Sequence, residues 1–430
     1  MEWQVGSVLF GSFIIMLLID FPIALALGFS SLLTVTIFSI VPLNFLPQLM
    51  FGTADSFTLL AIPFFVFTGI VLGHTSISKR LIELAECLVG NIPGGLGIVG
   101  IITAVFFAGI SGSGPADVAA IGLILIPAMT QAGYDRGFSA SLAAASGGIG
   151  IIVPPSIALI IYGFIAEVSI TQLFIAGIIP GIIVALSLIG VTFVISKRRG
   201  YHTLIKKRKK KKIGTAFRNA FWGLLAPVII LGGIYGGIFT PTEAAAVAVI
   251  YSIAVDVLMY RSMRLSDIIW IAGEAGVTSS VIMSIVVTAS LFAWILNTQG
   301  LAVMAASFLT SITSNHWFLL LIINFILICA GLFLDAISIF YIFLPILLPV
   351  IHAIGVNPLH FGIIMTVNLA IGQVTPPVGI NLVAASGISG ISIKRISISA
   401  LPFIAGECAA LLLVTYIPGL SLFLPDLFHF

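Results

Sequence analysis

The sequence predicts an all-α integral membrane protein made of two inverted repeats, each with a re-entrant helical hairpin and a broken helix. Three observations lead to this prediction. Of the 430 residues, 60% are hydrophobic and only 8% are charged, and the mean hydropathy is +1.25, whereas soluble domains carry about 25% charged residues. The basic residues gather in one loop, and prolines and glycines recur at a fixed spacing. Most of the chain must therefore face lipid or other apolar helices.

Apolar windows of the length needed to cross a membrane occur along the whole chain. A bilayer core takes about 20 apolar residues per helix. The clearest windows lie at 3–19, 21–41, 57–73, 169–195, 219–239 and 244–260, and others follow. The first window has no basic segment before it, and Asp20 and Pro22 lead directly into the second. We therefore expect the N-terminal segment to be retained rather than cleaved as a signal peptide.

The composition also argues against an enzyme or a classical metal site. The three cysteines and six histidines are scattered, without the close spacing of disulfide frameworks or zinc ligands. HExxH, Walker A and GxSxG strings do not occur in the sequence, although metalloproteases, ATPases and many hydrolases need them. We expect the chain not to be an enzyme.

The charge distribution predicts the topology. Eleven of the 18 basic residues lie between Lys197 and Arg218. A solvated linker is the plainer interpretation of this run, ahead of a site for lipid or nucleic acid, and we expect no nucleic-acid partner. Short loops rich in Lys and Arg stay cytoplasmic. If 93–131 and 316–352 are re-entrant hairpins, all 18 basic residues fall on the cytoplasmic side.

Prolines and glycines recur after a shift of 222 residues. The shift superposes four proline pairs, where composition alone predicts about half a match: Pro127 and Pro349, Pro154 and Pro376, Pro155 and Pro377, Pro180 and Pro402. Each half has an odd number of crossings, so the second copy is expected to be inverted. We predict a first repeat at 1–196, a basic cytoplasmic linker at 197–218 and a second repeat at 219–430.

Two places in each half cannot be continuous helix, because Pro breaks the helical hydrogen-bond ladder and Gly tolerates positive φ. The hairpin tips are SGSGPAD at 111–117 and the segment from Gly331 to Ser338. The broken helices are predicted at 137–166, around GIGIIVPP, and at 358–387, around AIGQVTPP. Pro and Gly can also simply kink membrane helices. Their recurrence in both halves favours a binding site, since irregular backbone at membrane depth must be buried or line a wet cavity.

The breaks present groups that suit a cation and a small anion. Unwound carbonyls carry negative partial charge, whereas half-helix N-termini carry positive partial charge. The predicted cation ligands are Ser111, Ser113, Gly114, Gly148, Val153 and Pro154 in the first half and Gly331, Asp335, Gly372, Thr375 and Pro376 in the second. The predicted substrate contacts are Asp117, Pro155, Arg136, Pro377 and Asn381. Helix capping is the competing interpretation for Asp117, and the preferred one for Glu243 in TPTEAAA.

Several long strings resemble one known family over essentially the whole chain. They are AIPFFVFTGIVL at 61–72, GISGSGPADVAAIG at 109–122, IVPPSIALIIYG at 152–163, GGIYGGIFTPTEAAAVAV at 232–249 and VTPPVGINL at 374–382. The sequence resembles the large membrane subunit of TRAP (tripartite ATP-independent periplasmic) transporters. The resemblance implies an elevator-type transporter of the bacterial inner membrane that takes up an organic acid, such as a dicarboxylate, a keto acid or a sialic acid. The coupling ion would be sodium, bound where each hairpin tip meets its broken helix.

The resemblance also implies partners. A small four-helix membrane subunit, expected on a separate chain, and a periplasmic substrate-binding protein would work with this subunit in the membrane lipid. A channel and an integral membrane enzyme are the alternatives. The duplicated broken helices favour alternating access over a channel, and the residues show no catalytic cluster in mutual spacing.

Overall fold

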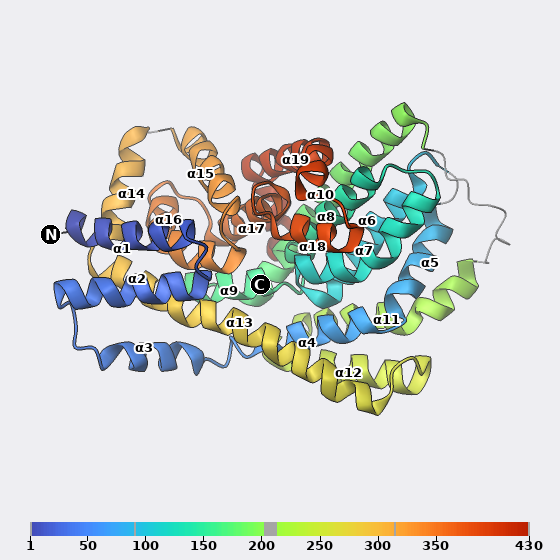
Figure 1. Ribbon diagram of the computed structural model, residues 1–430, viewed down its shortest axis with the longest axis horizontal. Helices are drawn as coiled ribbons and strands as arrows, with labels where there is room; N and C mark the ends of the chain where they lie inside the picture. Colours follow the sequence, from blue (N-terminus) through green and yellow to red (C-terminus); the bar gives the residue numbers. More distant parts are fainter. Residues whose placement is uncertain (1, 90–91, 202–212, 314, 429–430) are drawn as a thin grey trace.

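The computed structural model is an assembly of helices (Figure 1), as the sequence predicts, and it describes residues 2–89, 92–201, 213–313 and 315–428. Seven helices in these ranges are long and apolar enough to cross a membrane, or eight if the bent pair α4–α5 is one span. Between these ranges lies the basic run Lys206–Lys212, which is outside the described residues. No strand occurs in the described ranges.

Helices account for most of the described residues in each half of the chain. The first half contains α1 (Glu2–Leu18), α2 (Ile23–Phe38), α3 (Phe45–Ala54), α4 (Ala61–His74), α5 (Ile77–Val89), α6 (Gly95–Ser111), α7 (Gly114–Gln131), α8 (Arg136–Gly148), the 3₁₀ turn η1 (Ile149–Ile151), α9 (Ile157–Ala166) and α10 (Ile170–Arg199). The second half contains α11 (Ile213–Tyr235), α12 (Pro241–Ala254), the π-helix η2 (Val255–Tyr260), α13 (Leu265–Thr298), α14 (Leu301–Ile312), α15 (His316–Gly331), α16 (Ala336–Ala353), α17 (Pro358–Val374), α18 (Ile380–Ser389), α19 (Ile393–Tyr416) and α20 (Gly419–Leu427).

The outer helices form a frame along one side of the molecule. The 34-residue α13 packs against α2, α3, α4 and α16 and so runs beneath much of the assembly (Figure 1). Its hydroxyl groups bond to the preceding turn: Ser280 Oγ donates to Gly276 O at 2.7 Å and Ser284 Oγ to Ser280 O at 2.7 Å. Such bonds satisfy polar side chains where water is scarce.

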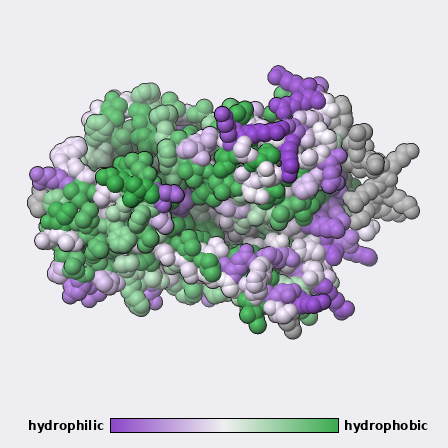
Figure 2. Space-filling view, viewed as in Figure 1, coloured by the Kyte–Doolittle hydropathy of each residue, from purple (hydrophilic) through white to green (hydrophobic). Residues whose placement is uncertain are grey.

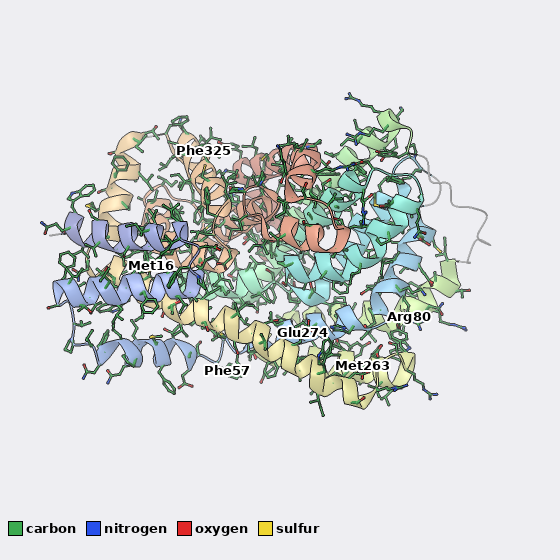
Figure 3. All side chains as sticks on the ribbon, viewed as in Figure 1. Met16, Phe57, Arg80, Met263, Glu274 and Phe325 are labelled. Atoms are coloured by element: carbon green, nitrogen blue, oxygen red, sulfur yellow. The ribbon has the colours of Figure 1, made fainter. Side chains whose placement is uncertain are left out.

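The bend between α4 and α5 is held from two sides. The two helices meet at 70°. At the end of α4, His74 Nε2 lies 3.1 Å from Glu274 Oε2 of α13, and the Arg80 guanidinium lies 4.1 Å from the centre of the Tyr260 ring. Figure 3 labels Arg80 and Glu274 on these elements. In Figure 1, α5 and α14 lie at opposite ends of the molecule.

The centre of the core is formed by α8 and α17. All residues of α8 except Arg136 are buried, and so are all those of α17 from His360 to Val374. A helix that is buried all round is enclosed by other helices, here α7, α18 and α19 around α8 and α15 and α19 beside α17. Tyr162 is fully buried in α9, and its hydroxyl donates to Pro358 O at 2.6 Å, which ties α9 to the start of α17.

The surface fits a chain that faces lipid. Large apolar side chains are strongly exposed, including Leu18 at 80% and Ile269 at 79%. Figure 2 shows hydrophobic residues over much of the visible face and hydrophilic ones gathered towards the end where α5 and the end of α10 lie. The last turn of α10 carries Lys197, Arg198 and Arg199.

Candidate functional site

The first hairpin turns at a glycine that touches the first broken helix. Between α6 and α7, Gly112 has φ +65°, a conformation that glycine adopts without steric cost. Its carbonyl accepts a hydrogen bond of 3.2 Å from Ile157 N, at the start of α9. A Cβ on Gly112 would lie 2.8 Å from Pro155 O, so the tip can approach this closely only without a side chain. Inside the tip, Ser111 Oγ donates to Asp117 Oδ1.

The first broken helix opens directly opposite this tip. The α-helical ladder of α8 ends at Gly148, η1 follows, and α9 begins only at Ile157. A Cβ on Gly150 would lie 2.3 Å from Asp117 Oδ2, and one on Gly147 would lie 2.9 Å from Gly114 O. The break and the hairpin tip are therefore in direct contact.

The second half has a comparably close backbone contact between its hairpin and its broken helix. A Cβ on Gly372 would lie 2.8 Å from Gly331 Cα, and Val378 N donates to Leu332 O at 3.3 Å. The Pro376–Pro377 peptide bond is cis, as is the Pro154–Pro155 bond of the first half. The second hairpin, α15 and α16, thus meets its broken helix, α17 and α18, at the predicted segments.

The two halves join at the first hairpin tip. A Cβ on Gly114 would lie 2.4 Å from Gln373 Oε1 and 3.3 Å from Asn381 Nδ2. Asn381 Nδ2 also donates to Ala144 O of α8 at 3.1 Å. The end of α17 and the start of α18 therefore complete the surroundings of Gly114 and Asp117, and one site draws on both halves of the chain.

Three buried oxygens around this junction have no hydrogen-bond partner among the described residues: Asp117 Oδ2, Gln373 Oε1 and Asn381 Oδ1. Asp117 and Asn381 are fully buried and Gln373 is 8% exposed. A buried acceptor without a partner costs about 1–3 kcal/mol, and a hard cation prefers oxygen ligands. These oxygens therefore fit a bound sodium ion. In the described ranges, His, Cys, Asp and Glu form no cluster of three or more, which excludes a transition-metal cluster of those ligands there.

The other predicted ligands have different surroundings from one another. Val153 packs on α10, since its Cγ2 would lie 2.4 Å from a Cβ on Gly181. Gly148 faces Ala370 O, 3.4 Å from where its Cβ would be. Thr375 Oγ1 donates to Ile371 O at 2.6 Å, and Pro154 O lies 4.0 Å from a Cβ on Gly109. Pro376 is half-buried and Pro377 is exposed.

Two acidic residues act as helix caps. Asp335 Oδ2 accepts from Ile337 N at 3.0 Å, and Ser338 Oγ donates to Asp335 Oδ1 at 2.5 Å, so this carboxylate caps α16. Glu243 forms a capping box with Thr240: Thr240 N donates to Glu243 Oε2 at 2.8 Å and Glu243 N to Thr240 Oγ1 at 3.3 Å. The capping interpretation of Glu243 is therefore the one that the structure bears out.

The predicted substrate contact Arg136 lies away from the junction. It opens α8, and its Nη2 lies 3.8 Å from a Cβ on Gly390. The neighbouring Asp135 caps α8 and pairs with Arg395 at 2.9 Å. Partial burial raises the pKa of Asp135, but hydrogen bonds from Phe138 N and Arg395 outweigh it and hold the pKa below its ordinary value.

Sequence reasoning missed Gln373 and a buried polar network in the second half. Asn368 Nδ2 donates to Asn324 Oδ1 at 2.9 Å, and Asn324 Nδ2 donates to Thr415 Oγ1 at 3.0 Å. His360 Nε2 lies 3.3 Å from Thr415 O. These residues stand singly within apolar runs, and the presence of an amide inside a predicted span was the available signal.

Comparisons with known proteins identify the family and the fold of this chain. The family model described as "Tripartite ATP-independent periplasmic transporter, DctM component" matches residues 10–420. The chain is 42% identical to the isethionate TRAP transporter permease protein DctMQ of Oleidesulfovibrio alaskensis, over 97% of this chain and 66% of that protein, so it spans just under two thirds of that relative's length.

Two further relatives are matched over nearly their whole length. The chain is 40% identical to the C4-dicarboxylate TRAP transporter large permease protein DctM of Pseudomonas aeruginosa (93% of this chain, 94% of that protein). It is 38% identical to the sialic acid TRAP transporter large permease protein SiaM of Vibrio cholerae (99% of each). Among solved structures, the YdaH transporter of Alcanivorax borkumensis has a similar fold, with a TM-score of 0.60, 15% identity and 87% of each chain covered.

Proposed function

Because the chain belongs to the DctM component family of TRAP transporters, we propose that it couples the uptake of an organic acid to sodium binding at the two contacts between hairpin tip and broken helix. The chain is a transporter large permease subunit of the bacterial inner membrane, and the expectation that it is not an enzyme is confirmed by this family. Dicarboxylates, keto acids and sialic acids are the substrate classes we propose. The names of two relatives mention the first and the last of these classes.

The observation that carries the proposal is the set of three unpartnered oxygens at the junction of α7, α17 and α18. Sodium bound there would neutralise Asp117 and satisfy Gln373 and Asn381 at the same time. Such binding would stabilise the contact between the two halves, so ion binding and the conformation of the site would be linked. We assign the second sodium ion to the Gly331–Gly372 contact, where backbone carbonyls would supply most ligands because the Asp335 carboxylate already caps α16.

The substrate would bind beside these sites, held by neutral groups. Half-helix N-termini present positive partial charge to a carboxylate, and the N-termini of α7, α9 and α18 follow the tips and breaks. Asn381, at the start of α18, has its amide nitrogen at the junction. The predicted contact Arg136 would then act at an entrance rather than at the junction.

We further propose an elevator mechanism, with α6–α10 and α15–α19 moving against the frame built on α13. Two features support it. The elements of 93–199 recur in the same order at 316–416, and α5 and α14 lie at opposite ends of the molecule, as inverted repeats require (Figure 1). The repeats 1–196 and 219–430, with the cytoplasmic linker between them, follow from the same argument.

The test is uptake by proteoliposomes that contain this chain, a small membrane subunit and a periplasmic binding protein. Labelled organic acid should accumulate only under an inward sodium gradient and only with all three components. Asp117→Asn should raise the sodium concentration for half-maximal uptake, whereas the matched variant Asp426→Asn, on the C-terminal α20, should not. Uptake driven by a proton gradient alone, or full-rate uptake by this chain alone, would contradict the proposal.

A further inference from the structure

Another buried carboxylate, Glu407, belongs to neither hairpin tip. It belongs to α19, one of the helices that could span a membrane, and its exposed fraction is 0%. At 1.5 Å per residue it lies about 13 Å from the nearer end of α19. Neither Glu407 Oε1 nor Oε2 has a hydrogen-bond partner among the described residues.

The contacts of neighbouring residues on α19 show which helices lie around this carboxylate. One turn before it, Phe403 packs on Phe138 of α8 with ring centres 5.5 Å apart. Beside it, Ser187 Oγ of α10 donates to Gly406 O at 2.6 Å. Two turns after it, Thr415 O lies 3.3 Å from His360 Nε2 of α17. Glu407 therefore lies among packed helices, at the height along α19 where the Phe403–Phe138 ring pair and Ser187 lie.

No cation on the helices packed against α19 reaches this level. His360 is about two turns, or roughly 12 Å, away along the helix axis, and the last turn of α10 begins about 15 Å from Ser187. The titratable groups of these elements are Arg136 on α8, Lys197, Arg198 and Arg199 on α10, His316 and Cys329 on α15, His360 on α17, and Lys394, Arg395, Cys408 and Tyr416 on α19 itself, while α18 has none. The only one next to Glu407 is the neutral thiol of Cys408.

An ionised carboxylate here would be a buried charge without compensation, which costs several kcal/mol. The neutral acid avoids most of that cost. We propose that Glu407 is a proton-binding site: it holds a proton in this conformation and releases it to water only in a state in which this face of α19 is hydrated. Low pH would then favour this conformation, and its stabilisation would be lost as the pH rises.

The proton can be detected without any transport assay. Infrared difference spectra of the complete transporter in lipid, recorded as the pH is stepped upward, should show the loss of a protonated carboxyl band. That band should be absent from Glu407→Gln and retained in the matched variant Glu167→Gln, whose side chain is exposed at the end of α9. A band that Glu407→Gln leaves unchanged, or no such band at all, would overturn the proposal.

Thermal unfolding provides a second measurement for the same variants. Glutamine resembles the neutral acid, so Glu407→Gln should fold and should match wild type at low pH. It should become the more stable of the two as the pH rises, whereas Glu167→Gln should follow wild type throughout. If Glu407→Gln is less stable than wild type at every pH, the ionised form is the native one and the proposal is wrong. Neither measurement depends on sodium coupling, so the proposed function can fail or hold separately.

Discussion

Replacing Gly372 with alanine tests the second proposed sodium site most directly. The added Cβ would lie 2.8 Å from Gly331 Cα and 3.0 Å from both its carbonyl carbon and oxygen, although carbon atoms prefer about 3.5–4.0 Å. All three neighbours are backbone atoms, so no side chain can rotate away. The hairpin tip and the broken helix must therefore separate by about 1 Å.

The expected magnitude follows from this overlap. Overpacking of a tight contact costs about 1–3 kcal/mol. If the sodium-bound state alone loses this energy, sodium affinity falls about 5- to 150-fold. Gly372→Val should be worse still, because a β-branched side chain adds a second clash and restricts the backbone.

The assay is the initial rate of uptake as a function of sodium concentration in proteoliposomes, with the amount of folded transporter measured in parallel. Gly387→Ala is the matched control: it lies in α18, and nothing lies within 4 Å of its added Cβ. The control should keep the wild-type sodium dependence to within about twofold. If Gly372→Ala also keeps it at normal abundance, sodium does not bind at this contact.

Three further predictions concern other residues. Asp117→Asn should raise the sodium concentration for half-maximal uptake with little change in thermal stability. Asp335→Asn should instead lower the stability of α16, by about 1 kcal/mol or less, because asparagine still caps a helix. Identical effects of the two variants on the sodium concentration for half-maximal uptake would contradict the assignment. The pKa of Asp135 is held low, so its contribution, about 1 kcal/mol or less for a partly exposed pair, should be present at neutral pH and lost as the pH falls through that lowered pKa. Arg395→Ala should shrink this acid-dependent loss in thermal unfolding, and an unchanged loss would rule out the pair as its source. A cysteine introduced at Ile205, in a background without native cysteines, should react only with a cytoplasmic reagent, and labelling only from outside would refute the topology.

The sequence predicted the breaks in the helices well, because their cause is local. Pro155 and Pro377 lie between helices, where a residue without a backbone N–H does not interrupt a hydrogen-bond ladder. Pro115 stands in the first turn of α7, where no intrahelical donor is needed. The same local logic identified the cap at Glu243, where Thr240 and Glu243 stand at the spacing of a capping box.

Features that depend on packing were not predictable from the sequence. Gln373 stands in the quoted string AIGQVTPP, but only the fold brings its amide to Gly114 of the other half. Asp335 has the same composition cues as Asp117, yet its carboxylate is occupied by the first turn of α16, whereas Asp117 Oδ2 is unpartnered. In the sequence, Glu407 is one polar residue in an apolar helix. Its lack of a hydrogen-bond partner depends on which faces of α8, α10 and α17 surround it.

The hydrogen bond from Asn381 to Ala144 O has a consequence for the chain as a whole. The first hairpin tip is enclosed partly by residues that follow it by more than 250 positions, so neither half contains all the residues of the proposed sodium site. A chain cut within 202–212 should be active only if its two fragments find each other again in the bilayer. Either fragment alone, however well folded, would be inert.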